Sequence, residues 1–120
     1  MTARNFRKTI FCDIDGTLFH HQDSLREMIT LPVKVLPGVN QKFKEWREKE
    51  YYIVLTTARP EGTRVITEQQ LLQNGIFFDQ LVMGLPVGCR VVVNDRKTNG
   101  MNTADAVCID RNEGLTNVEV

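Results

Sequence analysis

The sequence predicts a single α/β domain with a mainly parallel, five-stranded sheet. Short apolar runs rich in β-branched and aromatic residues alternate along the chain with longer amphipathic segments. Strands separated by about a dozen helical residues are typical of βαβ units, in which right-handed crossovers join parallel strands. With 120 residues the chain can bury one core, so residues 1–120 are expected to form one domain.

Local composition defines the expected strands. The first run, KTIFCDI, is short, apolar and β-branched, as a strand buried on both faces should be. The five expected strands are residues 8–14, 51–56, 77–83, 91–93 and 106–109. The connection between the third and fourth strands is too short for a helix, so that crossover is the weakest part of the predicted topology.

Two helices are expected between the first three strands. Residues 38–50 place Val39, Phe43 and Trp46 on one apolar face, and a second helix should run from Pro60 to the Asn-Gly pair at 74–75. Together with the strands they predict a Rossmann-like three-layer sandwich. Residues 17–36 have no clean period and leave room only for a short flap, so no large cap domain is expected.

Composition limits the partners and the compartment. Fifteen basic residues balance fifteen acidic ones, so no net field draws the chain to nucleic acid or to a membrane. Cys12 and Cys108 lie in apolar runs and are expected to be buried free thiols, which favours a reducing compartment. The basic N-terminus lacks the apolar stretch of a signal peptide, so a cytoplasmic protein is expected.

Two aspartates mark a candidate site directly after the first strand. In open α/β sheets, loops at the carboxyl ends of strands form the ligand crevice. Asp13 and Asp15 are two residues apart and would share a face of extended chain, and a divalent cation is the usual remedy for such crowding. Gly16 permits a tight turn and lets a ligand come close to the backbone. The Thr17 hydroxyl can hydrogen-bond to main-chain amides that the end of the strand leaves without a partner. The alternative is a plain acidic turn that caps the strand.

The segment Asp13-Ile14-Asp15-Gly16-Thr17-Leu18 resembles the first motif of haloacid-dehalogenase-like phosphohydrolases. The resemblance implies that Asp13 attacks phosphorus to form an aspartyl-phosphate. It also implies that Asp15 protonates the leaving oxygen and later activates water. Magnesium would be held by Asp13, by the main-chain carbonyl of Asp15, and by an acidic residue after a later strand. A cation is needed because a carboxylate and a phosphoryl group are both anionic.

The second strand ends in a segment similar to the second motif of that family, a Ser or Thr often followed by Gly-Arg. Alignment on the arginine makes Thr57 the motif residue, with Thr56 as the alternative. Its hydroxyl would donate to a phosphoryl oxygen, although a Thr at this place is also a common helix N-cap. Arg59 is expected either to orient the phosphate or substrate, or to pair with an acidic neighbour.

The segment ending Asn94-Asp95 resembles the fourth motif, in which adjacent acidic residues follow an apolar strand. Asp95 is the better candidate for the third magnesium ligand because a carboxylate binds a hard cation more strongly than an amide. The chain departs from the family's third motif, since no lysine occurs between Lys49 and Lys97. Lys97 or Arg96, which follow Asp95 and should lie nearer the site, or Arg90, which opens the strand and should lie at its far end, could supply the missing charge.

The implied activity is that of a small, capless, magnesium-dependent phosphomonoester hydrolase. Its partner would be a phosphorylated small molecule, with a sugar phosphate as the suggested substrate and self-association closing the open site. The main alternative is a weak or inactive phosphate- or metal-binding module. A phospho-acceptor signalling domain and a nucleic-acid end-processing phosphatase are less favoured, the latter because the charge is balanced.

Overall fold

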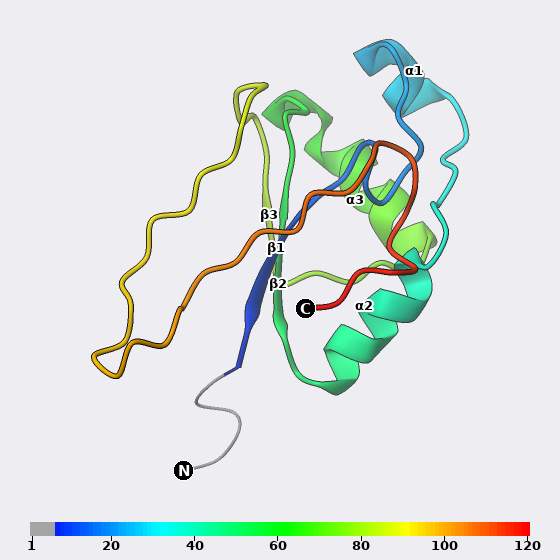
Figure 1. The fold of residues 1–120 in the computed structure, drawn as a ribbon. Coiled ribbons are helices and arrows are strands. Elements are labelled where there is room, and N and C mark those ends of the chain that lie inside the picture. Colours follow the sequence, from blue (N-terminus) through cyan, green and yellow to red (C-terminus); the bar gives the residue numbers. More distant parts are fainter. Residues whose placement is uncertain (1–6) are drawn as a thin grey trace.

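A computed structural model describes residues 7–120 as a parallel α/β fold (Figure 1). The strands are β1 (Thr9–Asp13), β2 (Tyr52–Thr56) and β3 (Gln80–Val82), and they lie in the order β1-β2-β3. Both pairs are parallel, and Asp13 lies opposite Thr56 at the carboxyl ends of β1 and β2. These strands confirm the positions of the first three predicted strands. The expectation that the first strand is buried on both faces is wrong, since Thr9, Phe11 and Asp13 are exposed. Residues 1–6, to which part of the signal-peptide argument refers, lie outside the described residues.

The helices confirm the crossover pattern. Helix α2 (Val39–Glu48) joins β1 to β2, and the 3-10 turn η2 (Glu61–Thr63) leads into α3 (Arg64–Gln73) between β2 and β3. The flap segment contains one further short helix, α1 (Leu25–Thr30). Among residues 7–120, the helices are all too short or too polar to cross a membrane.

The core lies between the sheet and the helices. Val39, Phe43 and Trp46 are buried on the inner face of α2, as the sequence predicts, and the Phe43 and Trp46 rings lie 5.1 Å apart. The C-terminal segment adds Leu115 and Val118 to this core. Gly114 is required there because a Cβ atom would collide with the main chain of Pro37.

The predicted fourth and fifth strands are wrong. Residues 91–93 and 106–109 have no strand structure, so the sheet in the described part of the chain has three strands rather than five. Residues 86–108 form an extended excursion, which we call the arm, and every arm residue except Thr103 is exposed. Cys108 is therefore exposed, contrary to expectation. A parallel strand next to β1 would need a crossover of a dozen or so residues, and only residues 84–90 separate Met83 from the valine run.

The three-layer prediction fails for the same reason. Successive right-handed crossovers that move in one direction across a sheet place their helices on the same face. In Figure 1, α1, α2 and α3 all lie to one side of the sheet, whereas the arm runs past the other side. A second helical layer would require the strand order to reverse at β1, and no strand pairs with the outer edge of β1 in residues 7–120.

Candidate functional site

The loop after β1 is a tight turn built on one carbonyl group. The Ile14 carbonyl accepts hydrogen bonds from the amides of Thr17, Leu18 and Phe19, at 3.1, 2.8 and 3.1 Å. Gly16 has a φ of 89°, and a Cβ atom there would lie 3.3 Å from the Arg111 side chain. The turn therefore needs glycine both for its conformation and for the close approach of the C-terminal segment.

Asp13 presents an exposed carboxylate at the carboxyl end of β1. Its closest side-chain partner is Thr17, whose hydroxyl donates a long hydrogen bond of 3.4 Å to Oδ2. Partial loss of water raises the pKa of the Asp13 carboxyl, and the negative charge of Asp15 raises it further. Three groups lower the same pKa: the main chain of Ile14, the charge of Arg90 and the Thr17 hydroxyl. The loss of water outweighs them, so the pKa of Asp13 lies above its ordinary value. Asp13 is thus a weakly bonded carboxylate whose charge is poorly compensated.

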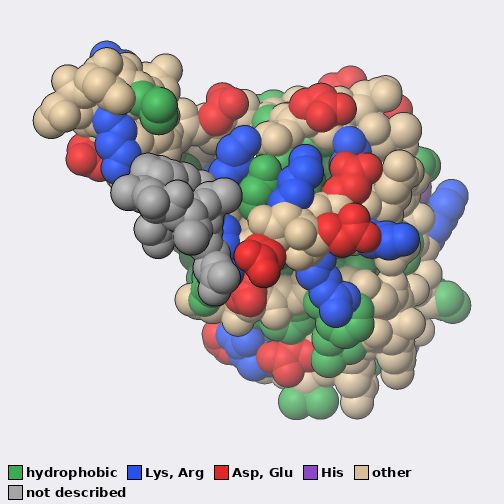
Figure 2. Space-filling view, turned by 90° about the horizontal axis from the view of Figure 1, so that it is seen from below, with side chains coloured by type: hydrophobic (Ala, Val, Ile, Leu, Met, Phe, Trp, Pro, Cys, Tyr) green, Lys and Arg blue, Asp and Glu red, His purple; other side chains and the backbone are tan. Residues whose placement is uncertain are grey.

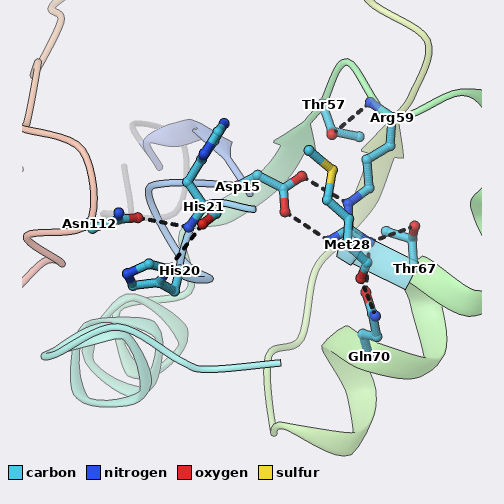
Figure 3. A network of polar contacts seen from close by, with 9 residues as sticks. All are labelled: Asp15, His20, His21, Met28, Thr57, Arg59, Thr67, Gln70 and Asn112. Carbon is cyan, nitrogen blue, oxygen red and sulfur yellow. Dashed lines mark hydrogen bonds and ion pairs between the residues drawn. The ribbon is translucent and has the colours of Figure 1, made fainter. Parts of the chain in front are cut away.

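Asp15 is held quite differently, by a two-point ion pair with Arg59. The Arg59 Nε donates to Oδ2 and Nη2 donates to Oδ1, both at 2.8 Å (Figure 3). The side chains are 2% exposed for Arg59 and 13% for Asp15. Of the roles foreseen for Arg59, the structure shows the pairing with an acidic neighbour. One lone pair on each Asp15 oxygen is occupied, so others remain free for proton exchange.

Arg59 is itself fixed by helix α3. Its Nη1 donates to the Thr67 hydroxyl at 3.1 Å and to the Gln70 Oε1 at 2.6 Å, and the Gln70 Nε2 donates to the Met28 carbonyl at 2.8 Å. Sequence reasoning missed Thr67 and Gln70. The signal was available, because Thr and Gln three residues apart on the inward face of a helix need buried polar partners.

The two threonines at the end of β2 have different surroundings. Thr57 is buried, and its hydroxyl accepts a hydrogen bond from the Arg59 amide at 3.0 Å. The hydroxyl therefore stabilises the turn that follows β2. Thr56 is half-buried and is the register partner of Asp13 on the neighbouring strand. Thr56, the alternative motif residue, therefore lies beside Asp13, whereas the Thr57 hydroxyl is bonded within its own turn.

Asp95 and Lys97 do not join this cluster. They lie at the tip of the arm, where Thr103 bonds to the Asp95 carbonyl and the Lys97 amide donates to the Met101 carbonyl at 3.0 Å. The arm tip protrudes from the rounded body (Figure 2) and lies away from the carboxyl ends of the strands (Figure 1). Of the three candidate cations, Arg90 is the one whose charge lowers the pKa of Asp13, contrary to the expectation that it lies at the far end of a strand.

The residues present fit a hard cation in part. In residues 7–120 no three His, Cys, Asp or Glu side chains gather closely enough to hold a metal ion. Asp13 nevertheless has the free carboxylate oxygen that Mg²⁺ prefers, and Mg²⁺ often uses one or two carboxylates and keeps several waters. Both Asp15 oxygens are engaged by Arg59, which leaves its main-chain carbonyl as the group for a metal.

The flap forms one wall beside Asp15. A small pocket is lined by Asp15 and Arg59 on one side and by His20, Glu27 and Met28 on the other. Neither His20 nor His21 is fully exposed; the His21 amide donates to the Asn112 Oδ1 at 2.7 Å, and the His20 Nδ1 lies 3.0 Å from the His21 carbonyl (Figure 3). The C-terminal loop thus supports the flap, a contact that no local sequence signal predicted.

Comparisons with solved structures find the same fold elsewhere. Neither a protein-family model nor a curated protein matches this sequence. Two structures of the Pnkp1/Rnl/Hen1 RNA repair complex match with a TM-score of 0.56 and 25% identity over 64% and 78% of this chain. This chain spans only 25% and 31% of the length of those chains.

Two further structures are similar at lower identity. A crystal structure of an MCSG target from Vibrio cholerae has a TM-score of 0.53 and 19% identity, over 71% of this chain and 79% of that one. D,D-heptose 1,7-bisphosphate phosphatase from B. bronchiseptica, complexed with magnesium and phosphate, has a TM-score of 0.47 and 23% identity over 68% of this chain and 54% of its own. The matches with TM-scores above 0.5 show a shared fold.

Proposed function

We propose that the protein is a haloacid-dehalogenase-like phosphatase that hydrolyses phosphomonoesters through an aspartyl-phosphate on Asp13. The observation that carries this proposal is the contrast between two neighbouring carboxylates. Asp13 is exposed and weakly bonded, whereas Asp15 is nearly buried and fixed by Arg59. Two carboxylates in different environments are suited to different roles, one as nucleophile and the other as acid and base.

The proposed reaction has two steps. In the first, an Asp13 oxygen attacks phosphorus, the bond to the ester oxygen breaks, and that oxygen takes a proton from Asp15. In the second, water attacks the phosphorus of the aspartyl-phosphate while Asp15 takes a proton from the water. Phosphate leaves and Asp13 is restored. Asp15 therefore acts as acid and then as base, which requires it to stay in one place through both steps.

Cations are needed to bring two anions together at this site. Magnesium, held by Asp13 and the main chain of Asp15, would screen the charge between the carboxylate and the phosphate. Arg90 is proposed to supply the positive charge of the absent third-motif lysine, because its charge already acts on Asp13. Asp95 could bind the metal, and Lys97 the phosphate, only if the arm folded back toward the carboxyl ends of the strands. Thr56 and the Gly16 turn are proposed to contact the phosphoryl oxygens.

Phosphate release from p-nitrophenyl phosphate and a panel of sugar phosphates, with and without magnesium, tests the proposal. We expect magnesium-dependent turnover that Asp13→Asn reduces by about 10⁴-fold or more, because the nucleophile is lost. Asp23→Asn, a change to an exposed carboxylate of the flap, is the matched control and should retain wild-type activity. Equal residual rates in wild type and Asp13→Asn would instead favour a phosphate- or metal-binding module.

A phosphorylated nucleic-acid end is a second candidate substrate, favoured by the similarity to a chain of an RNA repair complex. The balanced charge argues against it, and the face drawn in Figure 2 shows acidic and basic side chains intermixed rather than a basic stripe. Including 5′- and 3′-phosphorylated oligonucleotides in the panel decides between the two. Turnover of oligonucleotides alone would identify an end-processing phosphatase.

A further inference from the structure

One side chain joins the flap to the acid-base residue. Gln70 is 7% exposed and lies on the inner face of α3. Its Oε1 accepts from Arg59 at 2.6 Å and its Nε2 donates to the Met28 carbonyl in α1 at 2.8 Å (Figure 3). The chain of contacts therefore runs from α1 through Gln70 and Arg59 to the Asp15 carboxylate.

We infer that Gln70 is a positioning residue that couples the docking of α1 to the orientation of Asp15. The inference rests on the proposed function, since the role of Asp15 as acid and base comes from there. A guanidinium is a planar group with donors on three edges. Asp15 occupies one edge of Arg59, and Thr67 and Gln70 share Nη1, so the plane of the guanidinium is fixed only while these acceptors stay in place.

The orientation of the Gln70 amide is determined by its two partners. An amide oxygen must face the Arg59 donor and the amide NH₂ must face the Met28 carbonyl, so a flipped amide would lose both bonds. A movement of α1 that withdrew the Met28 carbonyl would release Gln70 and, through it, one constraint on Arg59. Flap position and carboxylate orientation are linked in this way through Gln70 and Arg59.

Helix α1 has little else to hold it. None of its six residues is buried, so apolar packing contributes little to its placement. Ser24 caps its N-terminus through the Glu27 amide at 3.1 Å, but that bond lies within the flap. The Gln70 bond reaches α1 from another element, at a carbonyl near the helix C-terminus that has no partner within a helix this short.

Leaving-group dependence tests the catalytic part of the inference. A poor leaving group, such as an alkyl alcohol, needs the proton from Asp15, whereas p-nitrophenolate leaves with little help. Gln70→Leu should reduce kcat/KM for an alkyl phosphate by about tenfold or more and change kcat/KM for p-nitrophenyl phosphate by less than about twofold. The ratio kcat/KM is compared because it reports phosphoryl transfer to Asp13 and leaves out the later hydrolysis of the aspartyl-phosphate, in which Asp15 acts on both substrates alike. Gln69→Leu, at an exposed neighbouring position of the same helix, is the control and should leave both values unchanged.

Amide hydrogen exchange tests the tether without reference to activity. The amides of Met28 and Leu31 are bonded within the flap, and in Gln70→Leu they should exchange several-fold faster than in wild type or Gln69→Leu. Should the leucine variant not fold, Gln70→Glu keeps an acceptor for Arg59 but has no donor for the Met28 carbonyl, and should show the same faster exchange.

The outcomes separate this inference from the proposed function. Equal losses of kcat/KM for both esters, or unchanged exchange in α1, would overturn the positioning role while leaving the phosphatase proposal intact. A wild-type protein that hydrolyses neither ester would overturn the phosphatase proposal and the catalytic part of this inference together. In that case faster exchange in the variant would still establish that Gln70 holds α1.

Discussion

The two acidic motifs of this chain end in opposite structural situations. Asp15 sits in a loop supported from three directions: by β1, by Arg59 after β2, and by the C-terminal loop, whose Asn112 amide donates to the Gly16 carbonyl at 2.9 Å. Asp95 follows a run of three valines and lies on the arm, where Val91, Val92 and Val93 are 79%, 56% and 93% exposed. Similar local patterns, an apolar run followed by aspartate, therefore have different structural outcomes.

The difference shows what an apolar run needs in order to become a strand. The run before Asp13 is linked to β2 through α2, and Cys12 of that run packs in one core with the inner face of α2. The run before Asp95 is preceded by a connection too short for a helix, so no crossover carries it to a sheet edge. A motif is positioned by the elements around it as much as by its own residues.

Thiol reactivity gives the largest expected contrast between the two regions. Cys12 lies in β1, and burial followed by the charge of Asp13 raises the pKa of its thiol to about 12, whereas Cys89 and Cys108 are exposed on the arm. Since the thiolate is the reactive form, at pH 8 Cys12 should react at least about a thousandfold more slowly with an aromatic disulfide reagent. Two fast thiols per chain are expected. A single fast thiol would mean that part of the arm is packed in solution.

Substitution of arginine should affect stability strongly in the core region and weakly at the surface. Arg59→Ala leaves the Asp15 carboxylate without its buried partner and should lower the free energy of unfolding by about 3–5 kcal/mol. The matched control is Arg64→Ala on the same crossover, which removes ion pairs with the more exposed Glu61 and Glu68 and should have a much smaller effect. Urea unfolding measures both, and equal losses would show that the Asp15 pair adds little.

Substitution of valine gives the smallest expected effect and tests the arm directly. Val93→Asp places a charge at an exposed position and should change the free energy of unfolding by no more than about 0.5 kcal/mol. Val54→Asp, in β2 at 5% exposure, is the buried counterpart and should cost about 4 kcal/mol or more. A loss at Val93 as large as that at Val54 would mean that the valine run packs, for instance on the open edge of β1, where Phe11 is 62% exposed.

Much of the fold and part of the site could be predicted from the sequence. The three strands, the two crossover helices and the turn after Asp13 depend on local periodicity and on glycine and proline positions, which a sequence displays directly. Helix α1 was missed although Ser24 and Glu27 have the spacing of a capping box, with the Ser24 hydroxyl donating to Glu27 at 3.0 Å.

Other features depend on contacts that are distant in sequence. The partner of Asp15 is 44 residues away, and the Asn112 contact with His21 spans 91 residues, so neither could be assigned from local patterns. That Thr56 rather than Thr57 lies opposite Asp13 depends on the register of β2 against β1. The fourth and fifth strands were expected from residue type alone, and residue type does not determine whether a run finds a partner.

The most direct test of the account is to trap the covalent intermediate. Asp15→Asn removes the proposed base of the second step. A substrate with a good leaving group, p-nitrophenyl phosphate carrying labelled phosphate, should therefore transfer its label to the protein and leave it there after an acid quench. We predict that the label maps to the peptide containing Asp13, is released by hydroxylamine, and is absent when Asp13 is also replaced by Asn. Label on another residue, or no magnesium-dependent label at all, would contradict the assignment of Asp13 as the nucleophile.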